Sequence, residues 1–267
     1  MRFSRLALAL GFSLAASAAN AALDTSPLPP KKPGWSFDGP LDMYDRASLQ
    51  RGFQVYKEVC STCHSLNRVA FAALSSDNGG YGFFTGPQAK AIAAGYKVPA
   101  DPNDKGETTD EKGQPLMRPG ITADHFPPPF PNEQAARASN AGALPPDLSV
   151  IVKARAGGPD YVYSILTGFH QKPPAGFTVL PNKYYNPYFN GWNISMPPPL
   201  APNQVTFSDG TKATVDQMAH DVVTFLSWAA EPTMEDRKRI GFGVMLFLLA
   251  FAGILYLSYR RIWADIH

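Results

Sequence analysis

The sequence predicts an all-α domain with long Pro/Gly-rich loop insertions, followed by one C-terminal transmembrane helix. Three observations predict this class: segments with helical periodicity, an uncharged apolar run near the C-terminus, and 26 Pro and 22 Gly in 267 residues. Strand-like alternation is weak throughout the chain. Proline cannot continue helices or central strands, so its clusters indicate irregular backbone between the helices.

The first predicted helix covers residues 46–60. Leu49, Phe53 and Tyr56 recur at positions i, i+4 and i+7 and therefore share one face. Gly52 lies in the same segment, and because it has no Cβ it would allow close approach of a second helix. The alternative is that Gly52 is an ordinary helix defect.

A second helix is predicted over residues 215–230, ending ahead of Pro232, since the residue before a proline disfavours helical backbone. Its apolar face consists of Met218, Val222, Phe225, Leu226 and Ala229. A third helix is predicted over residues 159–166, with Pro159 in its first turn. We expect the first two helices to cross and pack together.

The N-terminus has the pattern of a secretory signal peptide over residues 1–21. Arg2 and Arg5 precede an apolar stretch that is too short to span a bilayer, and Ala19-Asn20-Ala21 forms a small-x-small cleavage site. The alternative is a retained membrane anchor. With cleavage, the mature chain starts near Ala22, and residues 22–239 form an exported domain.

Residues 240–259 form an apolar run without a charge, long enough for a helix that crosses the hydrocarbon core. A buried core helix is the alternative, although few globular helices are apolar on every side. Basic residues flank both ends, so charge bias alone does not orient the helix. The signal peptide does: we expect the exported domain outside and residues 260–267 as a short cytoplasmic tail.

The two cysteines of the chain stand in Cys60-Ser61-Thr62-Cys63-His64, the spacing of covalent haem attachment. Each thiol can form a thioether with one haem vinyl group, and His64 can bind the iron as proximal ligand. The alternatives are a thioredoxin-like redox pair, which requires a βαβ context, and half of a zinc site, which lacks a second cysteine pair. With both thiols committed, no structural disulfide is expected.

The second axial position decides whether the iron is closed or open to ligands. Met196 is favoured, because Pro197, Pro198 and Pro199 stiffen the backbone that follows it. A methionine ligand gives a six-coordinate haem suited to electron transfer. The other candidates are Met117, His125, His170 and His220.

From residue 35 to residue 266 the chain resembles the cytochrome c1 family, the haem subunit of quinol–cytochrome c oxidoreductase (complex III). The motifs that carry the resemblance are YKEVCSTCHS at 56–65, MRPG at 117–120, ARASNAGALPPDLS at 136–149, ARAGGPDYVYSILTG at 154–168, YYNPYFNGWNISMPPPL at 184–200 and DVVTFLSWAAEPTMEDRKRIG at 221–241. The resemblance implies a cytochrome c-like haem domain with one covalently attached c-type haem.

The resemblance also implies residue roles. His64 and Met196 would be the axial ligands, Cys60 and Cys63 would carry the thioethers, and Arg155 would pair with a haem propionate, which a guanidinium binds well. The implied pocket lining is Asn140, Ala143, Leu144, Pro145, Pro146 and Tyr161. Some bacterial relatives carry an extra cysteine pair in the later loops, and this chain does not.

The function that the resemblance implies is an electron relay. The chain would accept an electron from a Rieske iron–sulfur protein and pass it to a soluble c-type cytochrome, beside cytochrome b in a dimeric complex of a bacterial inner membrane. Its haem domain would be periplasmic, and it would be an enzyme only as part of that complex. Net charge is +2, and neither a phosphate-binding loop nor a basic-aromatic stripe suggests nucleic acid.

Three other functions remain open: an anchored haem sensor or peroxidase with an open iron site, a haem-free thiol oxidoreductase, and the haem subunit of another respiratory complex. An acidic segment at residues 101–111 is a candidate docking surface for a positively charged cytochrome. The alternative is a solvated acidic loop. The acidic residues are Asp101, Asp104, Glu107, Asp110 and Glu111.

Overall fold

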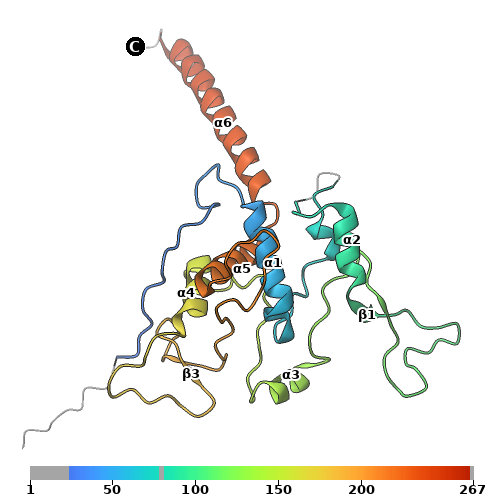
Figure 1. The fold of residues 1–267 in the computed structure, drawn as a ribbon. Helices are drawn as coiled ribbons and strands as arrows, with labels where there is room; N and C mark the ends of the chain where they lie inside the picture. The colour runs from blue at the N-terminus through green and yellow to red at the C-terminus, as the bar shows by residue number, and fades with distance from the viewer. Residues whose placement is uncertain (1–23, 78–80, 265–267) are drawn as a thin grey trace, which may run out of the picture.

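The computed structural model describes residues 24–77 and 81–264. Its helices are α1 (Arg46–Glu58), α2 (Gly86–Ala94), α3 (Glu133–Ser139), α4 (Gly158–Gly168), α5 (Val215–Ala230) and α6 (Met234–Trp263), with short 3-10 turns η1 (Cys60–Thr62) and η2 (Phe71–Leu74) (Figure 1). The predicted signal peptide and its cleavage point lie outside the described residues.

Helix α1 begins at Asp45, whose carboxylate accepts hydrogen bonds from the backbone amides of Ala47 and Ser48. It crosses α5 at Gly52, where an added Cβ would lie 2.0 Å from the carbonyl oxygen of Asp221. The predicted close approach is therefore confirmed. The predicted helix over 215–230 has the bounds of α5, and the predicted third helix is contained in α4.

Aromatic side chains fill the angle between the crossed helices. Phe53 of α1 and Phe225 of α5 meet edge to face with ring centroids 5.7 Å apart. Tyr56 lies 6.0 Å from Phe126, which reaches the core from the segment after β2. These rings are buried, and they connect α1 and α5 to the loops that follow the haem motif.

One carboxylate lies inside this packing. Asp221 is fully buried, with 0% of its surface exposed. It accepts hydrogen bonds from the guanidinium of Arg51 at 2.8 Å, from the hydroxyl of Ser48 at 2.6 Å and from the amide of Gln217 at 3.0 Å. A buried charge is tolerated only with such partners, so these contacts also fix the rotation of α1 relative to α5.

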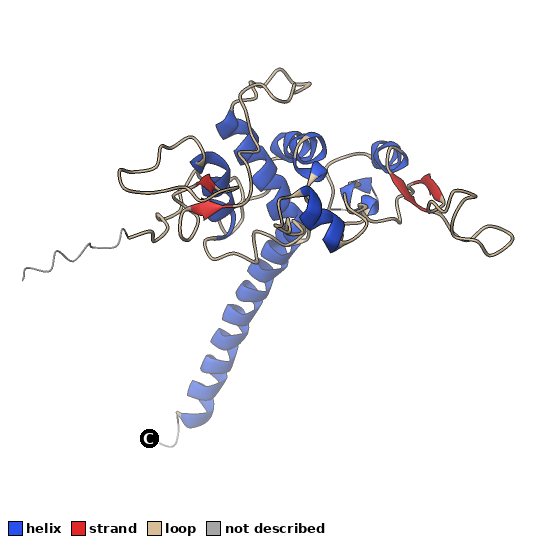
Figure 2. Cartoon of the chain, turned by 90° about the horizontal axis from the view of Figure 1, so that it is seen from below, coloured by secondary structure: helices blue, strands red, loops and turns tan. Residues whose placement is uncertain are grey.

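The prediction of an all-α domain holds only in part. The structure is helix-rich, but β1 (Lys97–Pro99) pairs with β2 (Met117–Pro119), and β3 (Tyr184–Tyr185) pairs with β4 (Asn193–Ile194), both antiparallel (Figure 2). These strands are two or three residues long, too short for alternation of polar and apolar residues to appear in the sequence. Each pair closes a long loop rather than building a layer.

Helix α6 leaves the domain as a single rod (Figures 1 and 2). It covers the whole predicted apolar run and extends past it at both ends, to Met234 and Trp263. Met234 at its start is buried in the main core, and its apolar side chains from Ile240 onward are exposed. Among the described residues it is the helix long and apolar enough to cross a membrane. This arrangement fits a membrane anchor.

The start of α6 is fastened to the turn ahead of α1. The ammonium group of Lys238 donates to three backbone carbonyls, those of Phe37 at 2.6 Å, Gly39 at 2.7 Å and Asp42 at 3.2 Å. Glu235 accepts from the backbone amide of Tyr44 at 2.9 Å. The anchor and the domain are thus joined by side chains as well as by the chain itself.

Candidate haem site

The cysteine motif follows α1 without a break. The 3-10 turn begins at Cys60, whose carbonyl accepts from the amides of Cys63 at 3.2 Å and His64 at 2.9 Å. These bonds wind the motif into one tight turn at the end of the helix. Cys60 is half-buried against the core and Cys63 is exposed, and both are free thiols.

The surroundings of Cys60 keep it protonated. Burial, assisted by the neighbouring Cys63, raises the pKa of the Cys60 thiol to about 12. Reactive redox cysteines instead have a lowered pKa, because the thiolate is the attacking species. Cys60 therefore lacks the electrostatics of the attacking thiol in a thiol–disulfide exchange site.

His64 is oriented by one hydrogen bond. Its Nδ1 lies 2.8 Å from the carbonyl oxygen of Pro146. A carbonyl only accepts, so the proton is assigned to Nδ1 and the lone pair to Nε2. Burial lowers the pKa of His64, against opposing effects from Pro146 and Asp147. The neutral ring with a free Nε2 is the form that binds a metal, and a carbonyl partner of this kind is common for histidine ligands.

Asp147 holds the segment that carries this carbonyl. Its carboxylate accepts from the Ser65 hydroxyl and from the Asn67 amide, both at 2.8 Å. Burial raises the pKa of Asp147, but these bonds and those from Ser149 outweigh it, so the net shift is downward. The role of Asp147 could not be predicted from the sequence, because an aspartate after two prolines is ordinary turn chemistry.

Met196 lies two residues after β4, between two apolar clusters. It packs against the main core and against a second cluster formed by Ile165, Tyr188 and Ile194. Tyr161 of α4 packs against the same second cluster. Met196 and Tyr161 thus border the same small cluster, and Cys60 and Met196 both pack against the main core.

The remaining predicted lining residues form the turn after α3. Asn140 ends α3, where its side-chain amide donates to the carbonyl of Ala136 at 2.7 Å and its own carbonyl accepts from the amide of Ala143 at 2.9 Å. Leu144 is 37% exposed, and this apolar side chain has room for a contact that the chain itself does not supply. Pro145 is half-buried, and Pro146 contributes its carbonyl to His64.

Arg155 is exposed just ahead of α4. Its guanidinium donates to the carbonyl of Ala154 at 3.0 Å, and among the described residues no carboxylate pairs with it. Burial raises the pKa of Tyr161, and the positive charge of Arg155 opposes that shift. Arg155 therefore keeps donors for an anion from outside the chain.

The alternative axial candidates lie in other surroundings. Met117 is 50% exposed on β2, and His170 is exposed after α4. The ring of His220 stacks on Trp35 with centroids 4.8 Å apart, and its Nε2 lies 3.3 Å from the carbonyl of Gly34. His125 forms an isolated bridge with Ala70.

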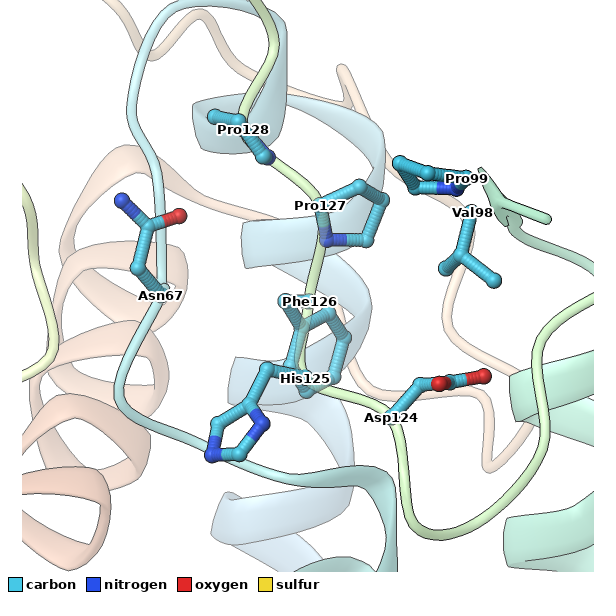
Figure 3. A pocket seen from close by; sticks show the side chains of 8 residues that line it. All are labelled: Asn67, Val98, Pro99, Asp124, His125, Phe126, Pro127 and Pro128. Atoms are coloured by element: carbon cyan, nitrogen blue, oxygen red, sulfur yellow. The ribbon is translucent and has the colours of Figure 1, made fainter. Parts of the chain in front are cut away.

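His125 also lines a surface cavity of about 320 Å³ between the segment after the haem motif and β1 (Figure 3). None of the residues predicted to line the haem pocket borders this cavity. Its walls are Asn67, Val98, Pro99, Asp124, His125, Phe126, Pro127 and Pro128. We therefore do not assign the cavity to a cofactor.

The donor set fits a covalently attached haem. It offers two free thiols on one turn, an imidazole with a free Nε2, and a thioether between apolar clusters. Within residues 24–77 and 81–264 no group of three or more His, Cys, Asp or Glu residues could hold a bare metal ion. The end of α1, α3 and the β3–β4 pair lie on the side of the domain away from α6 (Figure 1).

Comparisons with known proteins agree with this chemistry. Cytochrome b/c1 of Bradyrhizobium diazoefficiens is 48% identical over 89% of this chain and 36% of its own length. Cytochrome c1 of Rhodospirillum rubrum is 45% identical over 88% of each chain. The mitochondrial cytochrome c1 heme protein of Kluyveromyces lactis is 46% identical over 87% of this chain and 76% of its own length. The chain thus spans about a third of the first relative and most of the other two.

The Cytochrome C1 family model matches residues 35–266, which include the cysteine motif, the turn after α3, Met196 and α6. The resemblance expected from the motifs is thereby confirmed. With this match and these identities, the chain belongs to the cytochrome c1 family.

Proposed function

We propose that this chain is a membrane-anchored mono-haem c-type cytochrome and the electron-transfer subunit of a quinol–cytochrome c oxidoreductase. The family implies a c-type haem and a place in the bc1 complex. The observation that carries the proposal is the hydrogen bond from His64 Nδ1 to Pro146, which leaves Nε2 free beside two unpaired thiols. When bound, the haem supplies the one-electron chemistry of its iron.

Different residues would attach the haem and ligate its iron. Cys60 and Cys63, the two free thiols on one turn, would hold it through thioether bonds. His64, through its free Nε2, and Met196, through its thioether sulfur, would be the iron ligands. With both residues on the metal, substrates would be excluded from it, and the group would supply one-electron transfer without bond breaking.

The lining residues tune the site. Arg155 binds a propionate through the donors that remain free at its exposed guanidinium. Tyr161 and the turn with Asn140, Ala143, Leu144, Pro145 and Pro146 keep water away from the iron. Apolar surroundings disfavour the more highly charged oxidised site and thus raise the reduction potential.

The proposed partners are cytochrome b, a Rieske iron–sulfur protein as electron donor and a soluble c-type cytochrome as acceptor, in a dimeric complex. The relative names "Cytochrome b/c1" and, in Candida albicans, "Cytochrome b-c1 complex catalytic subunit" support the first of these. The proposed location is a bacterial inner membrane, with the domain of residues 22–239 in the periplasm, residues 240–259 across the bilayer and residues 260–267 in the cytoplasm.

The alternatives receive less support. A thiol oxidoreductase needs a reactive thiolate, whereas burial raises the pKa of Cys60 to about 12. A sensor or peroxidase needs an iron with a free coordination position. The packing of Met196 between two apolar clusters instead favours its use as a second ligand. A subunit of another respiratory complex would co-purify without cytochrome b and a Rieske protein.

The deciding experiment replaces Met196 by Leu in the haem-loaded full-length chain. We expect the reduction potential to fall by at least about 100 mV and the far-red methionine-to-iron band of the ferric form to vanish, because axial ligands set the potential. The matched control is Met117→Leu, on exposed β2, which should leave both unchanged. An unchanged potential in Met196→Leu together with a lowered one in Met117→Leu would reverse the assignment.

A further inference from the structure

An extended N-terminal segment lies along the part of the chain that carries Met196. We call residues 24–31 the N-terminal strap. Its backbone exchanges hydrogen bonds with the β3–β4 region: the Leu28 amide donates to Pro187 at 2.8 Å, and the Thr25 carbonyl accepts from Gly191 at 3.2 Å. In Figure 1 the blue chain starts beside the loops around β3 and rises along the side of the domain towards α1.

The strap also accepts a hydrogen bond from the side chain of Trp192. The indole Nε1 donates to the Ser26 carbonyl at 3.0 Å, and Trp192 is only 9% exposed. Its ring also packs edge to face against Phe177 and Tyr185, with centroids 5.5 and 5.8 Å away. The strap therefore closes over a tryptophan that is held on its other sides by aromatic rings.

The backbone of Trp192 is in a conformation that a bulky residue rarely adopts. Its φ is +57°, next to Gly191 at +72°. Such strain persists only where the surroundings over-determine it. Here the Trp192 amide donates to Phe189 at 2.9 Å, its carbonyl accepts from Asn186 at 3.0 Å, and its side chain is tied to Ser26.

This strained turn sets the direction of β4 and of the residues that follow it to Met196. Trp192 is followed directly by β4, Ile194 of β4 joins the second cluster, and Met196 packs on that cluster. A change in the backbone angles at Trp192 would therefore swing β4 and move the Met196 side chain.

A second attachment reaches the same cluster. The Lys31 amide donates to the Ser164 hydroxyl at 2.7 Å, and its ammonium donates to the Thr167 hydroxyl at 2.7 Å, both on α4. The ammonium also lies 5.3 Å from the ring centroid of Tyr188, a member of the second cluster. Both ends of the strap thus hold elements against which Met196 packs.

We propose that the N-terminal strap, acting through the positioning residue Trp192, holds Met196 on the iron. The strap would restrain the segment that carries Met196, as a disulfide between the later loops could do in its place. The described part of the chain has no disulfide. The inference rests on the proposed function in one respect, that Met196 is the axial ligand.

The test measures how readily Met196 leaves the iron. Free imidazole, added to the ferric full-length protein in detergent, binds only after the methionine dissociates. Trp192→Phe keeps an aromatic ring but removes the indole donor, and we expect imidazole to bind about fivefold faster, as for the loss of one hydrogen bond. Lys31→Met, which breaks the second attachment, should accelerate binding in the same direction.

The matched control is Trp228→Phe, which removes an indole bonded to the Tyr81 carbonyl at 2.8 Å, away from the strap, and should leave the rate unchanged. Wild-type rates in both Trp192→Phe and Lys31→Met would overturn the proposal. Met196→Leu distinguishes failure of the strap proposal from failure of the ligand assignment. We expect this variant to bind imidazole without the delay caused by methionine dissociation. If it binds imidazole no faster than wild type, Met196 is not the axial ligand.

Discussion

Gly52 is the residue at which α1 and α5 touch backbone to backbone. A Cβ there would lie 2.0 Å from the carbonyl oxygen of Asp221 and 2.8 Å from the Cβ of Phe225. Neither neighbour is the end of a flexible side chain, so neither can move aside cheaply. The position of the cysteine motif at the end of α1 thus depends on the missing side chain of one residue in the middle of the helix.

We predict that Gly52→Ala destabilises the domain by about 2 kcal/mol or more, because the helices must separate to admit a methyl group. The expected gain in helix propensity, about 1 kcal/mol, does not offset this. Denaturant unfolding of the detergent-solubilised chain measures the difference. Gly241→Ala is the control, since a Cβ there meets nothing within 4 Å. Equal stability of the two variants would refute the close-contact argument.

Ion pairs at the junction of α5 and α6 connect the membrane anchor to the domain. Glu231, which ends α5, pairs with Lys153 at 2.9 Å and with Arg237 of α6. Burial raises the pKa of Glu231, but the hydrogen bonds and charges of these two cations outweigh it, so the net shift is downward. One carboxylate therefore links the segment before α4, the end of α5 and the first turns of α6.

This shift fixes the sign of a pH effect. Because the folded-state pKa lies below the ordinary value of 4.5, the Glu231 carboxylate stabilises the fold above that pH and loses its effect as the pH falls below it. We predict that Glu231→Gln is less stable than wild type at neutral pH and that the gap narrows on acidification. Unfolding titrations between about pH 3 and about pH 7 measure this. A gap that widens on acidification would contradict the prediction.

The elements also show what a sequence can predict. Helices α1 and α5 were predictable because their apolar residues recur at helical spacing over several turns. Helix α2 was not predicted, although Thr85 and Gln88 form a capping box that indicates a helix start. The two-residue strands β3 and β4 carry no periodic signal at all.

Part of the candidate site could likewise be predicted from the sequence, and part could not. Cys60, Cys63 and His64 are a local pattern, so their spacing alone predicts the chemistry. The contacts of His64 with Pro146 and of Trp192 with Ser26 join residues far apart in the chain. Such contacts form only in the folded chain, so no local sequence motif predicts them.

At the scale of the whole molecule, the acidic segment forms the tip of a long loop between β1 and β2 that extends from the domain (Figure 1). Two of its acids serve the loop itself. Asp110 accepts from the amides of Lys112 and Gln114, both at 2.8 Å, and Glu107 accepts from Asn103 at 2.8 Å. Asp104 and Glu111 are exposed, so they are the better positions for testing attraction to a partner.

We predict that Asp104→Lys combined with Glu111→Lys slows electron transfer to a basic soluble cytochrome at low salt, and that the difference disappears at high salt. Stopped-flow kinetics across an ionic-strength series measure this. Lys105→Asp in the same loop is the control of opposite sign and should accelerate the reaction. Identical salt dependence in all three proteins would make the loop a solvated surface and nothing more.

The contact of Lys238 with three backbone carbonyls has a consequence for encounters at the membrane. A domain on a slack tether would turn freely above the bilayer, and each collision would have to wait for a favourable orientation. Fastened at its base, this domain instead takes its orientation from the tilt of the anchor. In the proposed function, the cysteine-bearing end, on the far side from α6, would then be presented to its partners at a constant angle.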